Sequence, residues 1–436
     1  MKETFKTSEY SDLQIKYRLS PQERAYLNSL ACKDDNQERK YRFHFEEFHN
    51  ILRFNTLSWV GVIELESLRI EIRPKFDERF TSLIDLICFV NRLPFHRWQD
   101  NQAVYARDDF MELLVQLFLS ELDKLIKHGL VKEYVTDEDN LRQLRGRPVF
   151  DQNLKRNLTN PTRIYCKFDE LESNVPENQV ILSALEMAYH FKLQPSTKRQ
   201  VNKYYCEFEK VCSPYSLPVL PSFNYHRLNA HYEKTHRLCS YILRCSSVSE
   251  IFRYQHVSFF SLLVDMNNLF EQFVAELLNR YLPDYYRLTT GKRIRDAIKC
   301  NGNFYREIKP DLLITNRENG NVAVLDAKYK HYGKRQVDTA DIFQVSFYAQ
   351  YFNRDLSAGH KSIIVYPLYP GDESKRLFID LIPSSPYYGS VKVEGISIEK
   401  VIESVKNNRT DYLKEQACSL ITEDQAEHST EAKVME

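Results

Sequence analysis

The chain has 436 residues, and its 60 lysines and arginines are balanced by 60 aspartates and glutamates, so the formal net charge at pH 7 is zero. This balance excludes a polybasic protein that coats DNA by charge alone, and any nucleic-acid contact must be local or shared with a partner. With 43% hydrophobic residues, 11 glycines and 16 prolines, the composition is that of an ordinary globular protein. The length predicts two or three domains.

The sequence shows no signal for a membrane or an export route. Its longest apolar runs fall short of the roughly 18 residues that cross a bilayer. The N-terminal segment MKETFKTSEYSD lacks the hydrophobic region of a signal peptide. The nine cysteines are odd in number and follow no disulfide framework. We therefore expect a protein of the reduced cytoplasm that does not contact a membrane.

The first half of the chain predicts strands followed by helices. The apolar run Trp59–Ile63 and the alternation over Leu68–Arg73, ended by Pro74, predict two neighbouring strands. Further along, apolar spacing predicts helices over 83–89, 110–126 and 180–191, and a short strand over 163–168. Residues 196–234 are rich in Tyr, Pro and Asn, which predicts a connector between helices.

From about residue 257 the pattern becomes α/β. Apolar residues recur at helical spacing from Met266 to Leu278, which predicts a helix of about four turns. The elements predicted after it are strands over 311–315 and 322–329, a helix over 339–352 and a strand over 362–366. The last fifteen or so residues have almost no apolar content and predict a disordered tail.

Two aspartates are predicted to meet at one end of a hairpin. Asn319-Gly320 separates two apolar runs and is typical of a type I′ turn, in which both central residues take positive φ. Asp311 begins the first predicted strand and Asp326 lies near the end of the second. An antiparallel hairpin brings those two ends together, so their carboxylates should be neighbours.

Lys328 is predicted to join this pair. Side chains alternate along a strand, so Asp326 and Lys328 should point the same way. Two adjacent carboxylates repel each other unless a cation neutralises them, and hard oxygen ligands favour Mg²⁺ or Mn²⁺. A metal-bound water is acidic enough to attack a phosphodiester, and a lysine beside it can orient that water or stabilise charge on the phosphate. The predicted site is therefore suited to phosphodiester hydrolysis.

Three further residues are candidates for this site. Glu271 lies on the preceding predicted helix, at the edge of its apolar stripe, and could supply a third carboxylate for the metal. Gln344 and Tyr348 are four residues apart on the following predicted helix and share one face. Both could contact DNA backbone or a metal-bound water.

The order helix-Glu, Pro-Asp, Asp-x-Lys and Gln-xxx-Tyr resembles the PD-(D/E)XK nuclease superfamily. The chain is most similar to McrC-like subunits of McrBC-type, modification-dependent (type IV) restriction systems. The similarity lies in five stretches between about residues 50 and 350, namely Trp59–Lys75, Leu144–Arg147, Phe168–Asn178, Asp265–Val274 and Lys309–Tyr329. Asp326 stands at the second acidic position, where the superfamily accepts either Asp or Glu.

This resemblance implies a fold and a function. The fold is an α+β multidomain protein with a β-containing partner-docking domain over 1–165, a helical connector over 166–255, a restriction-endonuclease-like α/β core over 256–415 and a tail over 416–436. The function is Mg²⁺- or Mn²⁺-dependent endonucleolytic cleavage of duplex DNA carrying modified cytosine. The implied partner is an McrB-like AAA+ GTPase ring, whose GTP hydrolysis the chain stimulates. The chain itself has no Walker A motif.

Several alternatives stay open from the sequence. The chain could be a non-catalytic adaptor of a ring NTPase, or a RecB-like exonuclease that acts with a helicase. Arg145, Gly146 and Arg147 could form a basic contact to DNA or to a partner, or they could form a turn in which Gly146 supplies unusual φ. Asp169, Glu170 and Asn178 match family positions, but a structural role is equally compatible. The cysteine pairs at 206/212 and 239/245 are spaced too widely for an ordinary zinc knuckle.

Overall fold

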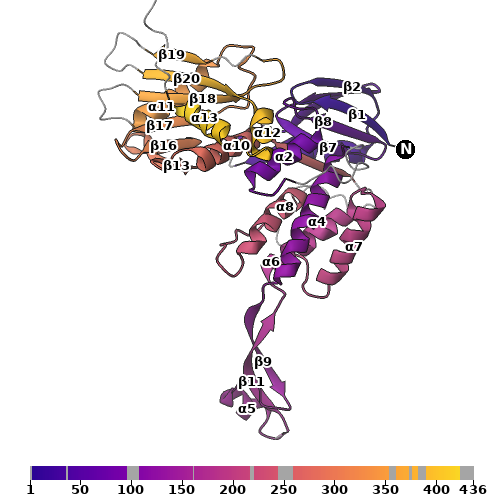
Figure 1. The fold of residues 1–436 in the computed structure, drawn as a ribbon. Coiled ribbons are helices and arrows are strands. Elements are labelled where there is room, and N and C mark those ends of the chain that lie inside the picture. The colour runs from indigo at the N-terminus through magenta and orange to yellow at the C-terminus, as the bar shows by residue number, and fades with distance from the viewer. Residues whose placement is uncertain are drawn as a thin grey trace, which may run out of the picture. The chain divides into compact units, whose positions relative to one another are not determined.

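The computed structural model describes residues 2–35, 38–95, 108–160, 162–216, 220–243, 259–352, 360–372, 376–381 and 389–422. The chain forms two compact units (Figure 1). The first unit combines Met1–Asp108 with Leu263–Glu436, and the second, Asp109–Leu262, is inserted between those two parts. Within the described ranges, none of the helices combines the length and the apolar character that crossing a bilayer requires. The predicted division into a docking domain, a connector and a nuclease core assigns a function to each region of the chain, and it stays a prediction.

The N-terminal part of the first unit is rich in strands. Its elements are β1 (Glu3–Ser8), β2 (Asp12–Lys16), α1 (Pro21–Ala31), β3 (Cys32–Asp35), β4 (Glu38–Tyr41), β5 (Phe43–Phe48), β6 (Ile51–Thr56), β7 (Trp59–Glu64), β8 (Leu68–Arg73) and α2 (Phe80–Val90). One sheet has the order β1-β8-β7-β12, where β12 is Phe260–Asp265, and a second has the order β2-β6-β5. β7 and β8 are antiparallel, with Ile63 opposite Ile70, so the two predicted strands are confirmed as neighbours.

The C-terminal part of the first unit is built on a six-stranded sheet in the order β13-β16-β17-β18-β20-β19. The strands are β13 (Tyr286–Thr290), β16 (Leu312–Asn316), β17 (Val322–Ala327), β18 (His360–Pro367), β19 (Leu377–Leu381) and β20 (Gly389–Ile396). β17, β18 and β20 run parallel, and the other neighbours are antiparallel. A separate hairpin joins β14 (Ile294–Cys300) to β15 (Asn303–Ile308).

Four helices pack on this sheet or on one another. They are α10 (Met266–Tyr281), α11 (Thr339–Phe352), α12 (Ile398–Lys406) and α13 (Thr410–Ile421). α11 connects β17 to the parallel strand β18, and its Val345 and Ala349 pack in one buried cluster with Val324 and Ile364. α10 contacts β17 as well as α2 and α13. Burial of each large aliphatic side chain contributes about 1.5–3 kcal/mol, so these contacts fix both helices against the hairpin strand.

The second unit is a helical body with a long β hairpin. Its elements are α4 (Phe110–His128), β9 (Glu133–Leu141), β10 (Arg147–Pro148), α5 (Phe150–Arg156), β11 (Ile164–Glu172), α6 (Pro176–His190), α7 (Pro195–Phe208), a 3₁₀ turn (Ala230–Tyr232) and α8 (Glu233–Leu243). α4, α6, α7 and α8 pack on one another. β9 and β11 pair over nine residues each, β10 extends that ladder, and α5 packs against β11.

Some sequence predictions need correction. The hairpin of β16 and β17 is confirmed, but its turn is not type I′, because Gly320 has φ 73° while Asn319 is not among the described residues with positive φ. Instead Asn316 N donates to Asn321 O, which closes a longer loop. The predicted connector over 196–234 contains most of α7, which packs through the buried side chains of Thr197, Val201 and Phe208 at helical spacing. α13 occupies the first residues of the predicted tail, and residues 423–436 lie outside the described ranges.

Candidate active site

Asp311 and Asp326 lie at the same end of the β16–β17 hairpin. The strand register places Leu312 opposite Leu325. Asp311, which precedes Leu312, and Asp326, which follows Leu325, are therefore neighbours. Asp311 Oδ2 accepts a hydrogen bond from the backbone N–H of Ala327 at 3.0 Å. Asp326 is only 2% exposed, because β17 is flanked by β16 on one side and β18 on the other. The predicted convergence of the two aspartates is therefore present.

Lys328 extends from the end of β17 toward these acids. Its Nζ lies 2.7 Å from Asp326 Oδ2 and donates a hydrogen bond to Gln344 Oε1 at 2.9 Å. Gln344 Nε2 in turn donates to the Tyr348 hydroxyl at 3.1 Å, as the shared face of α11 predicts. The backbone N–H of Lys328 donates to Val365 O, which anchors the residue to β18. The lysine is thus held in place from two elements.

The site concentrates negative charge that its surroundings do not fully compensate. Burial, followed by the charges of Asp326 and Glu271, raises the pKa of Asp311 well above its ordinary value. Burial is also the largest cause of the raised pKa of Glu271, and Asp326 adds to it while Lys309 and Lys328 oppose it. Glu271 on α10 is therefore within electrostatic reach of both aspartates. The three predicted carboxylates therefore influence one another electrostatically.

Lys328 is held in its charged form. Burial alone would lower its pKa, but the neighbouring charge of Asp326, with further contributions from Asp341 and Asp311, raises the pKa above its ordinary value. A lysine with this environment carries a positive charge at neutral pH. It can stabilise negative charge on a substrate, and it cannot act as a general base there.

The carboxylates fit a hard divalent cation of the magnesium type. Among the described residues, no three acidic, histidine or cysteine side chains lie together as a metal site, so the structure does not bring Glu271 into one ligand set with Asp311 and Asp326. Mg²⁺ does not require a set of three, because it is usually held by one or two carboxylates and keeps several waters. Burial and the charges of Asp326 and Glu271 raise the pKa of Asp311, and a bound cation would offset this effect.

One residue of this network was missed from the sequence. Asp341 on α11 is buried, and its Oδ1 lies 3.9 Å from Lys328 Nζ while its Oδ2 lies 2.7 Å from Lys330 Nζ. The Tyr332 hydroxyl also donates to this carboxylate. Helical spacing could have indicated it, since Asp341 precedes Gln344 by three residues and so lies on the same face of the helix.

Residues of the second unit that match family positions have structural contacts. Asn178 is fully buried, donates to the carbonyl oxygens of Val131 and Ser173, and accepts from the Tyr232 hydroxyl. Asp169 accepts from the Thr136 hydroxyl at 2.7 Å, and Glu170 pairs with Arg145.

The turn at Gly146 also has a structural explanation. Gly146 has φ 67°, and a Cβ there would lie 2.3 Å from Lys167 O, so the position requires glycine. Arg145 lies 4.4 Å from the centre of the Phe168 ring, next to its ion pair with Glu170. These contacts favour the interpretation of this segment as a turn over that of a DNA contact.

The sequence model of a family described as "McrBC 5-methylcytosine restriction system component" matches residues 54–367, which is more than half of the chain. The chain belongs to this McrBC family. The matched span includes all of the candidate site, from Glu271 to Tyr348. The family resemblance inferred from the five sequence stretches is confirmed. No curated protein matches the sequence.

A solved structure has a similar fold. A chain in the "Refined half-complex from tetradecameric assembly of Thermococcus gammatolerans McrB AAA+ hexamers with bound McrC" is similar over 93% of this chain and 100% of its own length, with a TM-score of 0.59 and 15% identity. At that identity the similarity shows a shared fold. The cryo-EM structure of the Thermococcus gammatolerans McrBC complex matches 64% of this chain and 88% of that chain, with 15% identity and a TM-score of 0.47.

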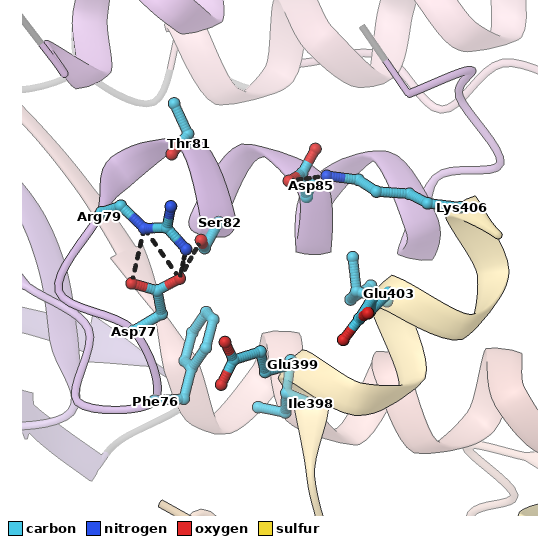
Figure 2. A pocket seen from close by; sticks show the side chains of 11 residues that line it. Phe76, Asp77, Arg79, Thr81, Ser82, Asp85, Ile398, Glu399, Glu403 and Lys406 are labelled. Carbon is cyan, nitrogen blue, oxygen red and sulfur yellow. Dashed lines mark hydrogen bonds and ion pairs between the residues drawn. The ribbon is translucent and has the colours of Figure 1, made fainter. Parts of the chain in front are cut away.

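The first unit of this McrBC-family chain also contains an acidic pocket of about 250 Å³ between α2 and α12 (Figure 2). Its lining includes the four carboxylates of Asp77, Asp85, Glu399 and Glu403 and the two cations of Arg79 and Lys406. Arg79 pairs with Asp77 at 2.6 Å, and Lys406 pairs with Asp85. The excess of carboxylates disfavours a DNA phosphate here, so this pocket is not a candidate for substrate binding.

Proposed function

We propose that the chain is the McrC-like nuclease subunit of a restriction system and cleaves duplex DNA carrying modified cytosine. The proposal assigns its C-terminal α/β part to the PD-(D/E)XK superfamily. The observation that supports it most is the convergence of Asp311, Asp326 and Lys328 at one end of a hairpin, with Gln344 from the following helix on the lysine. Membership of the McrBC family and the fold shared with a chain of an McrB–McrC complex also support the proposal.

Each residue of the site has a separate role in the proposed reaction. Asp311 and Asp326 would hold Mg²⁺ or Mn²⁺, with Glu271 as a third acidic group at the same site. The ion, when bound, supplies an acidic water and neutralises charge on the phosphate. Lys328 stays protonated and stabilises the charge that develops on the phosphoryl oxygens. Gln344 orients the lysine through the hydrogen bond to its Nζ.

The partner we propose is an McrB-like AAA+ GTPase ring, whose GTP hydrolysis the chain stimulates. The hairpin region of the second unit exposes several large apolar side chains, which is unusual for a surface that stays in water. They include Tyr134 at 76% exposure, Phe150 at 73%, Leu154 at 64% and Leu158 at 76%. We infer that this surface contacts the ring. It lies on β9, α5 and the loop before β11.

Cleavage of a circular substrate tests the proposed activity. The full chain, an McrB-like partner, GTP and Mg²⁺ are incubated with closed circular DNA that carries 5-methylcytosine. The expected result is a linear product that requires the partner, the nucleotide and the metal. Digestion of linear DNA but not of circular DNA would favour the exonuclease alternative, because an exonuclease needs an end. Stimulation of the partner's GTPase without any cleavage would identify the chain as a non-catalytic adaptor.

Two variants test the partner surface in the same mixture. Phe150→Ser and Leu158→Ser are expected to weaken binding to the ring and its GTPase stimulation, while the isolated chain unfolds at the same temperature as the wild type. Leu228→Ser is the matched control, because Leu228 is 71% exposed in the same unit but lies outside the hairpin region. Equal loss of binding in all three variants would contradict a partner surface on the hairpin region.

A further inference from the structure

A second pocket in the first unit, of about 270 Å³, is lined by basic and aromatic side chains. Its lining comes from the turn after β1, the end of β8, the segment between β17 and α11, and the residues after β18. The lining residues are Tyr10, Lys75, Lys330, His331, Arg335 and Tyr369. Four of these six side chains are basic, and among the described residues no carboxylate lines the pocket. The exposed wall of the pocket is mostly apolar, and the basic side chains around it can hold an anion there.

Three of the basic residues are held in position by carboxylates that do not line the pocket. Lys330 Nζ lies 2.8 Å from Asp338 Oδ2, and Arg335 approaches the same oxygen at 3.9 Å. His331 Nε2 lies 2.8 Å from Asp372 Oδ2. These pairs fix the positions of the Lys330, His331 and Arg335 side chains around the pocket.

Lys75 differs from the other three. In the part of the chain that the structure describes, it forms no ion pair, and its Nζ lies 5.5 Å from the centre of the Tyr10 ring. Its backbone N–H donates to Glu9 Oε1 at 2.8 Å, which fixes where the side chain begins. The Lys75 ammonium interacts electrostatically with the buried Glu9 carboxyl, but among the described residues it forms no ion pair, so it remains available to an anion in the pocket.

The carboxylate of Asp341 connects the pocket to the candidate catalytic lysine. Asp341 places Oδ2 2.7 Å from Lys330 Nζ in the pocket and Oδ1 3.9 Å from Lys328 Nζ in the candidate active site. Lys328 and Lys330 also lie two residues apart on the same segment. A DNA strand whose scissile phosphate reaches Asp311 and Asp326 therefore has a neighbouring part of its backbone close to the pocket.

We propose that this pocket binds a backbone phosphate of the cleaved DNA strand, adjacent to the scissile one, and so positions the strand for cutting. Lysine, arginine and tyrosine are common donors to DNA phosphates, and such contacts fix the register of a protein on DNA without reading its sequence. The inference rests on the proposed nuclease function, which supplies the DNA. In this proposal Lys75 and Arg335 are positioning residues and do not take part in the chemistry.

The salt dependence of DNA binding tests the proposal. Equilibrium binding of a fluorescent duplex is measured between 50 and 200 mM salt in EDTA, with the full chain and its partner. Each phosphate contact contributes about 0.9 to the slope of log K against log salt concentration. Lys75→Gln is expected to reduce that slope by about 0.9, and to weaken modified and unmodified duplexes by the same factor. Lys75→Arg should restore it.

A control variant and a second ligand make the outcome decisive. Lys16→Gln removes an exposed lysine from β2, outside the pocket, and should leave the slope unchanged. A wild-type slope for both Lys75→Gln and Arg335→Gln would overturn the proposal. Binding of inorganic phosphate or GTP that Lys75→Gln abolishes, with DNA binding unaffected, would also overturn it and assign the pocket to a free ligand.

The failure of this proposal is distinguishable from the failure of the proposed function. If the wild type cuts circular DNA while Lys75→Gln keeps the wild-type slope, only the phosphate pocket is wrong. If the wild type does not cut any DNA but Lys75→Gln still loses about 0.9 of the slope, the pocket stands and the nuclease function fails.

Discussion

Replacing Glu9 by glutamine is expected to stabilise the protein above neutral pH. Glu9 is fully buried, and its Oε1 accepts hydrogen bonds from the Tyr329 hydroxyl at 2.6 Å and from Lys75 N at 2.8 Å. In the part of the chain that the structure describes, its Oε2 has no hydrogen-bond partner. Burial outweighs the two hydrogen bonds and raises the pKa of this carboxyl from 4.5 to about 7. Folding therefore favours the protonated form.

The size and sign of the effect follow from this difference in pKa. A rise from 4.5 to about 7 corresponds to about 3 kcal/mol between the two protonation states. Because the pKa is raised, the favourable contribution is complete below pH 4.5 and is lost as the pH rises through about 7. The wild type should thus lose up to about 3 kcal/mol of stability over this range from Glu9, whereas glutamine cannot ionise and loses none.

Urea unfolding at several pH values between 5 and 8.5 measures this difference. The Glu9→Gln variant should exceed the wild type by less than about 1 kcal/mol at pH 5 and by about 3 kcal/mol at pH 8.5. Glu3→Gln is the matched control, because Glu3 lies exposed on the same strand region and its replacement should leave the pH dependence unchanged. If Glu9→Gln showed the pH dependence of the wild type, the raised pKa would be refuted.

Three further variants test contacts within one unit or the other. Lys406→Met should cost about 3 kcal/mol of stability, because it leaves the buried carboxylate of Asp85 unpaired, and adding Asp85→Asn should recover part of that loss in urea unfolding. Gly146→Ala should lower stability locally, because its Cβ would lie 2.3 Å from Lys167 O, and hydrogen exchange of the β9–β11 hairpin should accelerate while α4 is unaffected. Asn178→Ala should lower the free energy of unfolding, measured by urea unfolding, by about 1–3 kcal/mol, since it removes a buried side chain with three hydrogen-bond partners.

Local patterns in the sequence predicted much of the candidate site. Helical spacing predicts α11 over the residues that form it, Thr339–Phe352, and the alternation of β17 predicts a shared direction for Asp326 and Lys328. The pairing of β16 with β17 follows from two short apolar runs around one turn. These features depend on residues that are close in the sequence, and one hairpin is enough to bring the aspartates together.

Features that depend on distant segments were not predictable in the same way. Asp341 joins the site only because α11 packs on β17 and β18, and the pocket around Lys75 requires segments from both parts of the first unit. The turn after Asn316 was mispredicted, because a longer loop closed by Asn316 and Asn321 competes with the two-residue turn. The order of the six strands likewise depends on contacts between residues far apart in the chain.

The most direct test of the account is single-turnover cleavage by Asp326→Asn beside wild type, with the McrB-like partner, GTP and Mg²⁺. The account predicts at least about a hundredfold slower cutting of circular modified DNA, with partner binding and GTPase stimulation unchanged. Asp284→Asn, which alters an exposed turn of the same unit, should cut at the wild-type rate. Wild-type cleavage by Asp326→Asn would contradict the assignment of this hairpin end as the catalytic centre.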